Sequence, residues 1–107
     1  MTNFQDRERA EEAKFAHDED MAFRITARRN KLLGQWAAQK MSLTAEETEA
    51  YAKSVVQADF EEAGDEDVIR KILGDLVGAG VDIDEAGVRA ALEEKNVEAR
   101  RQLMGEA

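Results

Sequence analysis

The sequence predicts an all-α fold, a four-helix bundle preceded by a mobile N-terminal segment. Proline is absent from the 107 residues. The composition is rich in Ala, Glu, Arg and Leu and lacks runs of β-branched or aromatic residues, which favours helices almost everywhere. Glycine, Ser or Asp interrupts the helical pattern at residues 40–43, 63–65 and 78–84. Three breaks separate four helices, which we expect at about residues 20–41, 44–63, 65–79 and 84–104.

The first helix carries an apolar stripe at the three-and-four spacing of a surface that faces a core. Arg29 interrupts this stripe. The apolar members of the stripe are Ala22, Ile25, Leu32, Leu33, Trp36 and Ala37.

The second helix begins with a capping box, in which Thr44 accepts a hydrogen bond from the Glu47 amide and Glu47 accepts one from the Thr44 amide. Gly64 can adopt the left-handed conformation that ends a helix. Asp65 is then expected to cap the third helix. The expected core face of the second helix is Tyr51, Ala52, Val55, Val56, Phe60 and Ala63.

The third and fourth helices also have clear apolar faces and clear ends. We expect Gly80 to end the third helix and Asp82 or Asp84 to begin the fourth. Short connections predict that consecutive helices are antiparallel neighbours. The core face of the third helix is Val68, Ile69, Ile72, Leu73, Leu76 and Val77. That of the fourth helix is Val88, Ala91, Leu92, Lys95, Ala99 and Leu103.

Residues 1–19 form a unit of their own, distinct from the bundle expected over residues 20–107. Ten of the first twenty positions are charged, and only Phe4, Phe15 and small alanines are available for burial. Helix nucleation is costly, so we expect this segment to be mobile when the protein is free. Composition leaves two interpretations open. The segment is either a frayed terminus or a segment that orders on a partner, anchored by its two phenylalanines.

The net charge excludes some classes of function. The chain has 15 Lys and Arg against 24 Asp and Glu, a formal net charge of −9 at pH 7. This argues against a nucleic-acid binder, which needs a concentrated basic surface, so proteins are the expected partners. No stretch is long and apolar enough to span a bilayer, and no Cys is present. We expect a cytoplasmic protein without direct membrane insertion, monomeric when free.

The charge is also unevenly distributed. Residues 1–40 hold 8 basic and 7 acidic groups, whereas residues 41–107 hold 7 basic and 17 acidic groups. Two runs of opposite sign stand out, and they could attract each other across the bundle. The basic run is Arg24, Arg28, Arg29 and Lys31, and the acidic run is Asp59, Glu61, Glu62, Asp65, Glu66 and Asp67.

Metal binding and catalysis are not expected. Residues 82–87 together with Glu93 match four positions of an EF-hand calcium loop, but Ala86 fails at the fifth position. Asp84 as a helix N-cap explains the same residues. His17, the one histidine, is expected on the surface. No nucleophile has a partnering base elsewhere, so we expect neither an enzyme nor a metal site.

The basic run carries the one candidate for a small ligand. Arg24, Arg28, Arg29 and Lys31, with Trp36 close by, could hold a nucleotide or another phosphate compound weakly. An ion-paired or solvated face is the usual interpretation of such a run. No phosphate-binding loop motif is present, so we expect no cofactor.

Several longer stretches of the sequence resemble a known family. They are FQDRE at 4–8, AKFAHD at 13–18, TARRNKLLG at 26–34, WAA at 36–38 and ADFEEAGDED at 58–67. These stretches resemble the zeta-type inhibitor subunit of alphaproteobacterial F-type ATP synthase. The resemblance spans essentially the full chain and is looser from about Ala86 onward.

The resemblance implies a four-helix bundle and a protein inhibitor of ATP hydrolysis. Its N-terminal segment would enter the catalytic interface between the alpha and beta subunits of F1, near gamma, and block rotation in the hydrolysis direction. The protein would then be peripheral to the inner membrane while bound to F1. The residues implied in contact with the motor are Thr2, Asn3, Phe4, Asp6, Arg7, Glu8, Glu11, Lys14 and Phe15. The alternative hypothesis is a small helical sensor that binds a nucleotide or phosphate ligand near Arg24, Arg28, Arg29 and Trp36.

Overall fold

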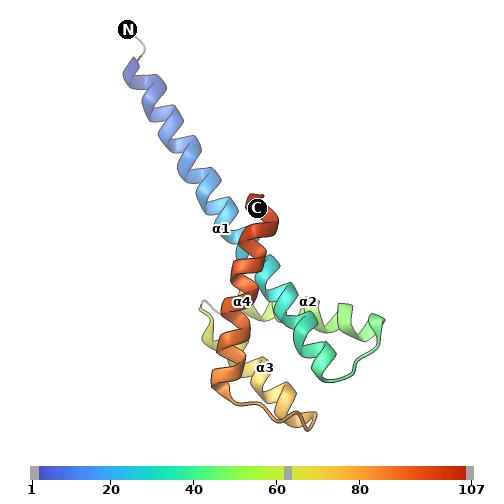
Figure 1. Cartoon of the computed structure of the whole chain (residues 1–107). Coiled ribbons are helices and arrows are strands. Elements are labelled where there is room, and N and C mark those ends of the chain that lie inside the picture. Colours follow the sequence, from blue (N-terminus) through green and yellow to red (C-terminus); the bar gives the residue numbers. More distant parts are fainter. Residues whose placement is uncertain (1–2, 62–63, 106–107) are drawn as a thin grey trace.

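The chain is all-helical over the residues that the structure describes. This computed structural model describes the backbone of residues 3–61 and 64–105, and the side chains of residues 19–59 and 64–105. Within these ranges there are four helices and no strand (Figure 1). The predicted fold class is therefore confirmed. The helices are α1 (Asn3–Lys40), α2 (Ala45–Glu61), α3 (Glu66–Gly78) and α4 (Glu85–Met104).

The bounds of α2, α3 and α4 lie within two residues of the expected ones, and α1 is the exception. This helix begins at Asn3, whereas the sequence places the start of the bundle near residue 20. The side chains of residues 1–18 lie outside the described residues. The division of the chain into a segment of residues 1–19 and a bundle of residues 20–107 therefore stays a prediction.

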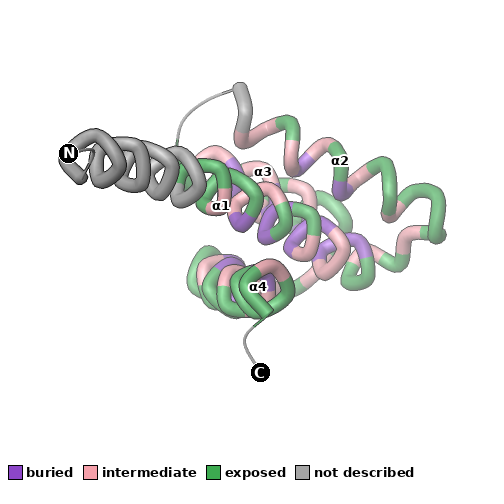
Figure 2. Tube along the Cα trace, turned by 90° about the horizontal axis from the view of Figure 1, so that it is seen from above, coloured by how far each residue is buried: buried purple, intermediate pink, exposed green. Residues whose placement is uncertain are grey.

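Helix α1 is the central element of the bundle. It contacts each of the other three helices, and most extensively α2 and α4. Seen from above, it lies between α4 and α2 (Figure 2). Helices α1 and α4 run side by side in opposite directions (Figures 1 and 2). The surface of α1 is therefore divided between a face toward α2 and a face toward α4.

Two helix beginnings have the caps that their sequences predict. The Thr44 amide donates to Glu47 Oε1 at 2.9 Å, and the Glu47 amide donates to Thr44 Oγ1 at 3.2 Å. The first of these bonds holds the pKa of the Glu47 carboxyl below its ordinary value. At the start of α4, Asp84 Oδ1 accepts from the Gly87 amide at 2.9 Å. Asp84, one of the two expected N-caps, is the one used.

Three helix ends among the described residues use a left-handed residue: Ser42 after α1, Gly80 after α3 and Gly105, with φ +67°, after α4. Gly80 has φ +82°, and the Val81 amide donates to the Leu76 carbonyl at 2.9 Å, which closes the end of α3 as predicted. At the end of α1 the same arrangement is built on Ser42, with φ +59°. The Leu43 amide donates there to the Ala38 carbonyl at 3.0 Å. Gly64 also has a positive φ, +108°, in the connection between α2 and α3.

One predicted cap is wrong in its chemistry. Asp65 stands at the N-cap position of α3, but its backbone is helical, with φ −81° and ψ −16°, and its side chain makes no capping hydrogen bond. Its carboxylate instead accepts from Arg29 of α1 at 2.9 Å. The Asp65 carboxylate pairs with the buried Arg29 and not with a backbone amide of α3, because an unpaired buried charge costs more free energy than an exposed amide that water can satisfy.

The core is formed by all four helices and contains most of the predicted residues. Two predicted members are wrong: Ala22 is exposed, and Val77 is 57% exposed. Ala22 precedes Ile25, the first buried position among the described side chains of α1, and Val77 lies beside a narrow buried face that is centred on Ile72 and Leu76. The core cluster is Leu33, Ala37, Val55, Val68, Ile69, Ile72, Leu76, Val88, Ala91 and Leu92. Phe60 and Ala63 lie outside the residues whose side chains are described.

At Gly34, helix α1 lies in close contact with α2. A Cβ built on Gly34 would lie 2.8 Å from the Cα of Ala52 and 3.2 Å from Cγ2 of Val55. Real Cβ atoms do not approach backbone atoms so closely, so this crossing requires glycine. By contrast, a Cβ built on Gly74 of α3 would meet no atom within 4 Å.

Candidate functional site

The residues of the predicted inhibitory segment lie at the N-terminal end of the chain. Thr2 lies outside the described residues, and α1 includes the backbone of the other eight implied residues. The side chains of Asn3, Phe4, Asp6, Arg7, Glu8, Glu11, Lys14 and Phe15 lie outside the described residues, as does that of His17. Their contacts with a motor therefore stay predictions.

Helical periodicity divides the basic run between two faces of α1. Arg24, Arg28 and Lys31 are spaced by four and three residues, so they share one exposed face. Arg24 Nε lies 3.1 Å from Asp20 Oδ2, and both side chains are more than half exposed. Arg28 Nη1 donates to Gln102 Oε1 of α4 at 3.0 Å. These three cations lie together at the surface, as the ligand hypothesis requires.

Arg29 and Trp36 lie apart from those three cations. The Arg29 side chain is only 7% exposed, and its Nη2 donates to Asp65 Oδ1 at 2.9 Å. Arg29 Nε and Nη2 also donate to Asn30 Oδ1, both at 3.1 Å. Trp36 packs against the core, with Lys40 Nζ 5.4 Å from its ring centroid. The structure therefore does not bring all five residues of the suggested ligand site together.

The Arg29–Asp65 pair confirms that the two charged runs attract each other. Arg29 belongs to the basic run of α1, and Asp65 belongs to the acidic run between α2 and α3. Their ion pair ties the α2–α3 connection to the central helix. Beside it, Nδ2 of Asn30 is buried with no hydrogen-bond partner among the described residues. Arg29 therefore orients the side-chain amide of Asn30 through its oxygen. Within the described part of the chain the buried Nδ2 is left without a hydrogen bond, which costs free energy.

Two adjoining hollows form a groove beside the three exposed cations. One hollow, of about 470 Å³, lies where α1, α2 and α4 meet, and is lined by Phe23, Arg24, Ala27, Arg28, Lys31, Val56 and Leu103. The other, of about 340 Å³, continues between α1 and α2, and is lined by Lys31, Gln35, Glu49, Ala52, Lys53, Val56 and Gln57. Lys31 and Val56 belong to both hollows. We call the two together the α1–α2 groove.

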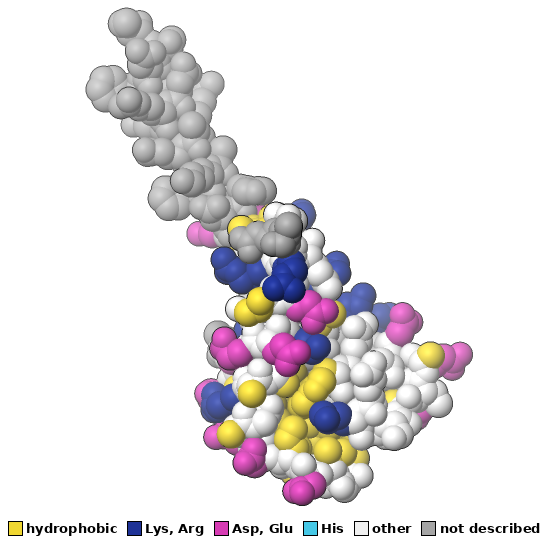
Figure 3. All heavy atoms as spheres, viewed as in Figure 1, with side chains coloured by type: hydrophobic (Ala, Val, Ile, Leu, Met, Phe, Trp, Pro, Cys, Tyr) yellow, Lys and Arg dark blue, Asp and Glu magenta, His cyan; other side chains and the backbone are white. Residues whose placement is uncertain are grey.

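The sequence analysis identified three of the four cations of this groove, Arg24, Arg28 and Lys31, but missed Lys53 and the apolar floor. Phe23, Ala27 and Leu103 come from two helices, and no local pattern joins residues 23–27 of α1 to residue 103 of α4. Phe23 is 54% exposed, so its ring is available at the surface of the groove. Figure 3 shows Lys and Arg side chains gathered where the described part of α1 joins the body of the molecule.

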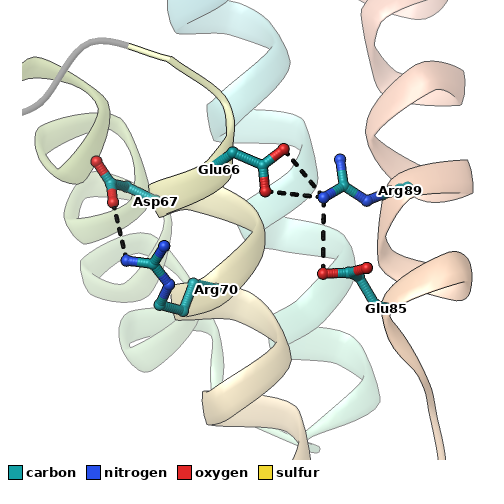
Figure 4. A network of polar contacts seen from close by, with 5 residues as sticks. All are labelled: Glu66, Asp67, Arg70, Glu85 and Arg89. Atoms are coloured by element: carbon teal, nitrogen blue, oxygen red, sulfur yellow. Dashed lines mark hydrogen bonds and ion pairs between the residues drawn. The ribbon is translucent and has the colours of Figure 1, made fainter.

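A polar network joins α3 to α4 on the surface (Figure 4). Arg89 Nη2 donates to both carboxylate oxygens of Glu66, at 2.8 and 3.0 Å, and lies 3.6 Å from Glu85 Oε1. The hydrogen bond with Arg89 lowers the pKa of Glu66, and the same bond raises the pKa of Arg89. Asp67 and Arg70 form a separate pair within α3, at 3.3 Å. The exposed network fixes the start of α3 against α4 and contains no nucleophile.

A second network joins α2 to α3. The Tyr51 hydroxyl donates to Asp75 Oδ2 at 2.7 Å, and Lys71 Nζ lies 3.1 Å from the same oxygen. Lys71 Nζ also lies 5.1 Å from the Tyr51 ring centroid. Burial, and then the hydrogen bond to Asp75, raise the pKa of Tyr51 well above its ordinary value. Tyr51 thus stays protonated at neutral pH and acts as a hydrogen-bond donor between helices.

The described residues contain neither a metal-ligand cluster nor a membrane-spanning helix. No group of three or more His, Asp or Glu residues among them is arranged to hold a metal ion. Asp84, the central residue of the EF-hand-like stretch, uses its carboxylate on the Gly87 amide. None of the helices, over the part of the chain that is described, is long and apolar enough to cross a membrane.

Comparisons with known proteins identify a family and a similar solved structure. A sequence model of the family described as ATPase inhibitor subunit zeta matches residues 1–102, nearly the whole chain. A structure solved by solution NMR is 52% identical to this chain, with a TM-score of 0.70. The alignment covers 81% of this chain and 99% of that one. Comparison with curated proteins gave no match.

Proposed function

Because this chain belongs to the ATPase inhibitor subunit zeta family, we propose that it inhibits ATP hydrolysis by the F1 motor of an ATP synthase. The observation that carries the proposal is the extent of the family match, which includes residues 1–18 as well as the helices of the bundle. An inhibitor of this kind is a binding protein without catalytic activity of its own. It acts in the cytoplasm, at the inner membrane when bound to F1.

The segment of residues 2–18 is the inhibitory element in this proposal. It enters the interface between the alpha and beta subunits, near gamma, and blocks rotation in the hydrolysis direction. Two features of the sequence support this role. Phe4 and Phe15 can anchor the segment in an apolar pocket, and the charges of Arg7, Glu8 and Lys14 can pair with groups of the motor. Ordering such a segment costs roughly 1–2 kcal/mol per residue, so the motor must provide a deep binding site.

The four-helix bundle anchors the segment. Helix α1 extends from Asn3 to Lys40 and is packed against α2, α3 and α4. A bundle held outside the motor by a continuous helix would keep the segment inserted while the motor applies torque. No cofactor takes part in this action.

ATP hydrolysis by cognate F1 tests the proposal. The full chain, added in excess, should inhibit hydrolysis, and a chain lacking residues 1–18 should not. The double substitution F4A/F15A should weaken inhibition, because it removes the two apolar anchors. The matched control V77A/V97A removes two exposed apolar side chains of the bundle, 57% and 53% exposed, and should inhibit as the unsubstituted chain does. Circular dichroism establishes that each variant is folded. Full inhibition by the truncated chain would refute the role of the segment.

A weak nucleotide or phosphate site is a second proposal, with narrower support. Arg24, Arg28 and Lys31 lie together on the α1–α2 groove, but Arg29 is paired with Asp65 inside the fold. Trp36 lies outside that groove, so its fluorescence is a poor reporter of a ligand bound there. Equilibrium dialysis with ATP and ADP measures binding directly. The absence of binding at millimolar concentrations would exclude this site.

A further inference from the structure

We propose that the α1–α2 groove is a docking site for an acidic amphipathic helix of the ATPase, separate from the site that receives residues 2–18. This inference rests on the proposed function, because it names how the bundle is held on the motor. It assigns to the bundle a contact surface of its own. The two sites then bind the same complex through different chemistry.

The shape and lining of the groove fit a helix. Phe23, Ala27 and Leu103 form the apolar floor at one end, and Ala52 and Val56 continue it between α1 and α2. Along α1 the groove extends over thirteen residues from Phe23 to Gln35, roughly 18 Å between their Cα atoms at a rise of about 1.5 Å per residue. That length matches about three turns of a docked helix, whose apolar residues would lie along the floor at spacings of three and four.

The charges on the groove select an acidic partner. Arg24, Arg28, Lys31 and Lys53 line it, against Glu49 as its one acidic lining residue. Among the described residues no ion pair involves Lys31 or Lys53, and Arg28 contacts a neutral acceptor, Gln102. Residues 41–107, which contribute only Lys53 to these cations, are strongly acidic, with 17 acidic and 7 basic groups. A concentrated basic groove on such a chain attracts a negatively charged surface.

Other occupants fit less well. A free phosphate makes no apolar contact, and a nucleotide is too small to cover an apolar floor that extends over three helices. A nucleic acid would meet a chain with a net charge of −9. A second copy of this chain would bring mostly acidic surface to the groove, but also strong repulsion between the remaining surfaces. A helix with an apolar stripe and acidic flanks could pack its stripe on the apolar floor and pair its carboxylates with the cations of the rim.

Charge reversal on the rim tests this proposal. In the variant R28E/K31E two exposed cations of the groove become acidic, and binding to purified cognate F1 should weaken by at least tenfold. The control R70E/R100E makes the same change of charge at two exposed positions outside the groove, and its affinity should stay within about twofold. Binding is measured with the full-length chain at two salt concentrations. The salt dependence should be smaller for R28E/K31E than for the control.

A photoreactive residue at position 57 identifies the occupant. Gln57 lines the groove and is exposed, so a benzoylphenylalanine there should cross-link to an acidic helical segment of an F1 subunit. Cross-links to residues 2–18 or to a second copy of the chain would overturn the proposal, and so would the absence of any cross-link. Equal binding by R28E/K31E and the unsubstituted chain would overturn it while leaving the proposed function intact, provided that the chain still inhibits hydrolysis. A full chain that neither binds nor inhibits F1 would overturn both.

Discussion

Replacing Gly34 by Ala should separate α1 from α2 and destabilise the bundle. The new Cβ would lie 2.8 Å from Cα of Ala52, 3.2 Å from Cγ2 of Val55 and 3.3 Å from Cβ of Ala52. Carbon atoms in contact prefer about 3.5–4.0 Å, so the two helices must move apart by roughly 1 Å. The nearest atom belongs to the backbone of a residue that is 2% exposed, so no side-chain rotation relieves the contact.

The expected cost follows from two opposing effects. Overpacking a core costs about 1–3 kcal/mol, and a clash with backbone belongs at the upper end. Alanine in a helix interior recovers about 1 kcal/mol relative to glycine. The net loss of unfolding free energy should therefore be about 2 kcal/mol. In a chain of this length that corresponds to a fall in Tm of roughly 10 °C.

Gly74→Ala is the matched control for this prediction. Gly74 is inside α3, and a Cβ built there meets nothing within 4 Å. This variant should gain about 0.5–1 kcal/mol, because it carries only the propensity effect. Urea unfolding followed by circular dichroism at 222 nm measures both variants. If Gly34→Ala were as stable as Gly74→Ala, the close approach of α1 and α2 would not require glycine and the reasoning would fail.

Three further predictions concern single contacts. Ser42→Gly should stabilise the fold by about 0.5–1 kcal/mol, because Ser42 has a left-handed backbone that costs a non-glycine residue energy; a lower urea midpoint would contradict this. Tyr51→Phe should cost about 1 kcal/mol, because the half-exposed Asp75 loses a 2.7 Å hydrogen bond and keeps Lys71; unchanged stability would mean that water replaces the hydroxyl without loss. The Arg89 contact lowers the pKa of Glu66, so its stabilisation is complete above the ordinary carboxyl pKa near 4.5 and is lost as the pH falls through the lower folded-state value. The stability difference between the unsubstituted chain and Glu66→Gln should therefore shrink below pH 4.5 in urea titrations, and a difference independent of pH would contradict this contact.

The features that the sequence predicted correctly are mostly local. Each of these features depends on residues within a single turn, so the neighbouring residues in the sequence determine it. They are the Thr44–Glu47 capping box, the Asp84 cap and the left-handed Gly80. The apolar faces were predicted where a helix is covered along its whole length. The prediction was wrong for Ala22, which lies near the end of the covered part of α1, and for Val77, which lies beside the narrow buried face of α3.

The features that were missed depend on contacts between helices. Nothing near Gly34 in the sequence indicates that Ala52 lies against it, and Gly74 has the same local context of a glycine within a helix. The floor of the α1–α2 groove needs Phe23 of α1, Val56 of α2 and Leu103 of α4 to meet. Such meetings are set by helix crossing geometry, which the periodicity of a single helix does not contain.

The wrong cap of α3 and the interrupted stripe of α1 have one explanation. Arg29 is four residues from Ile25 and from Leu33, both buried, so helical geometry places its guanidinium on the core face. A buried cation must be paired, and Asp65 supplies the carboxylate at 2.9 Å. An Oδ1 that accepts from Arg29 does not cap α3, and the α2–α3 connection is drawn onto α1 instead. The same periodicity leaves Arg24, Arg28 and Lys31 exposed on the opposite side. One basic run therefore supplies a structural ion pair inside the bundle and the rim of a binding groove outside it.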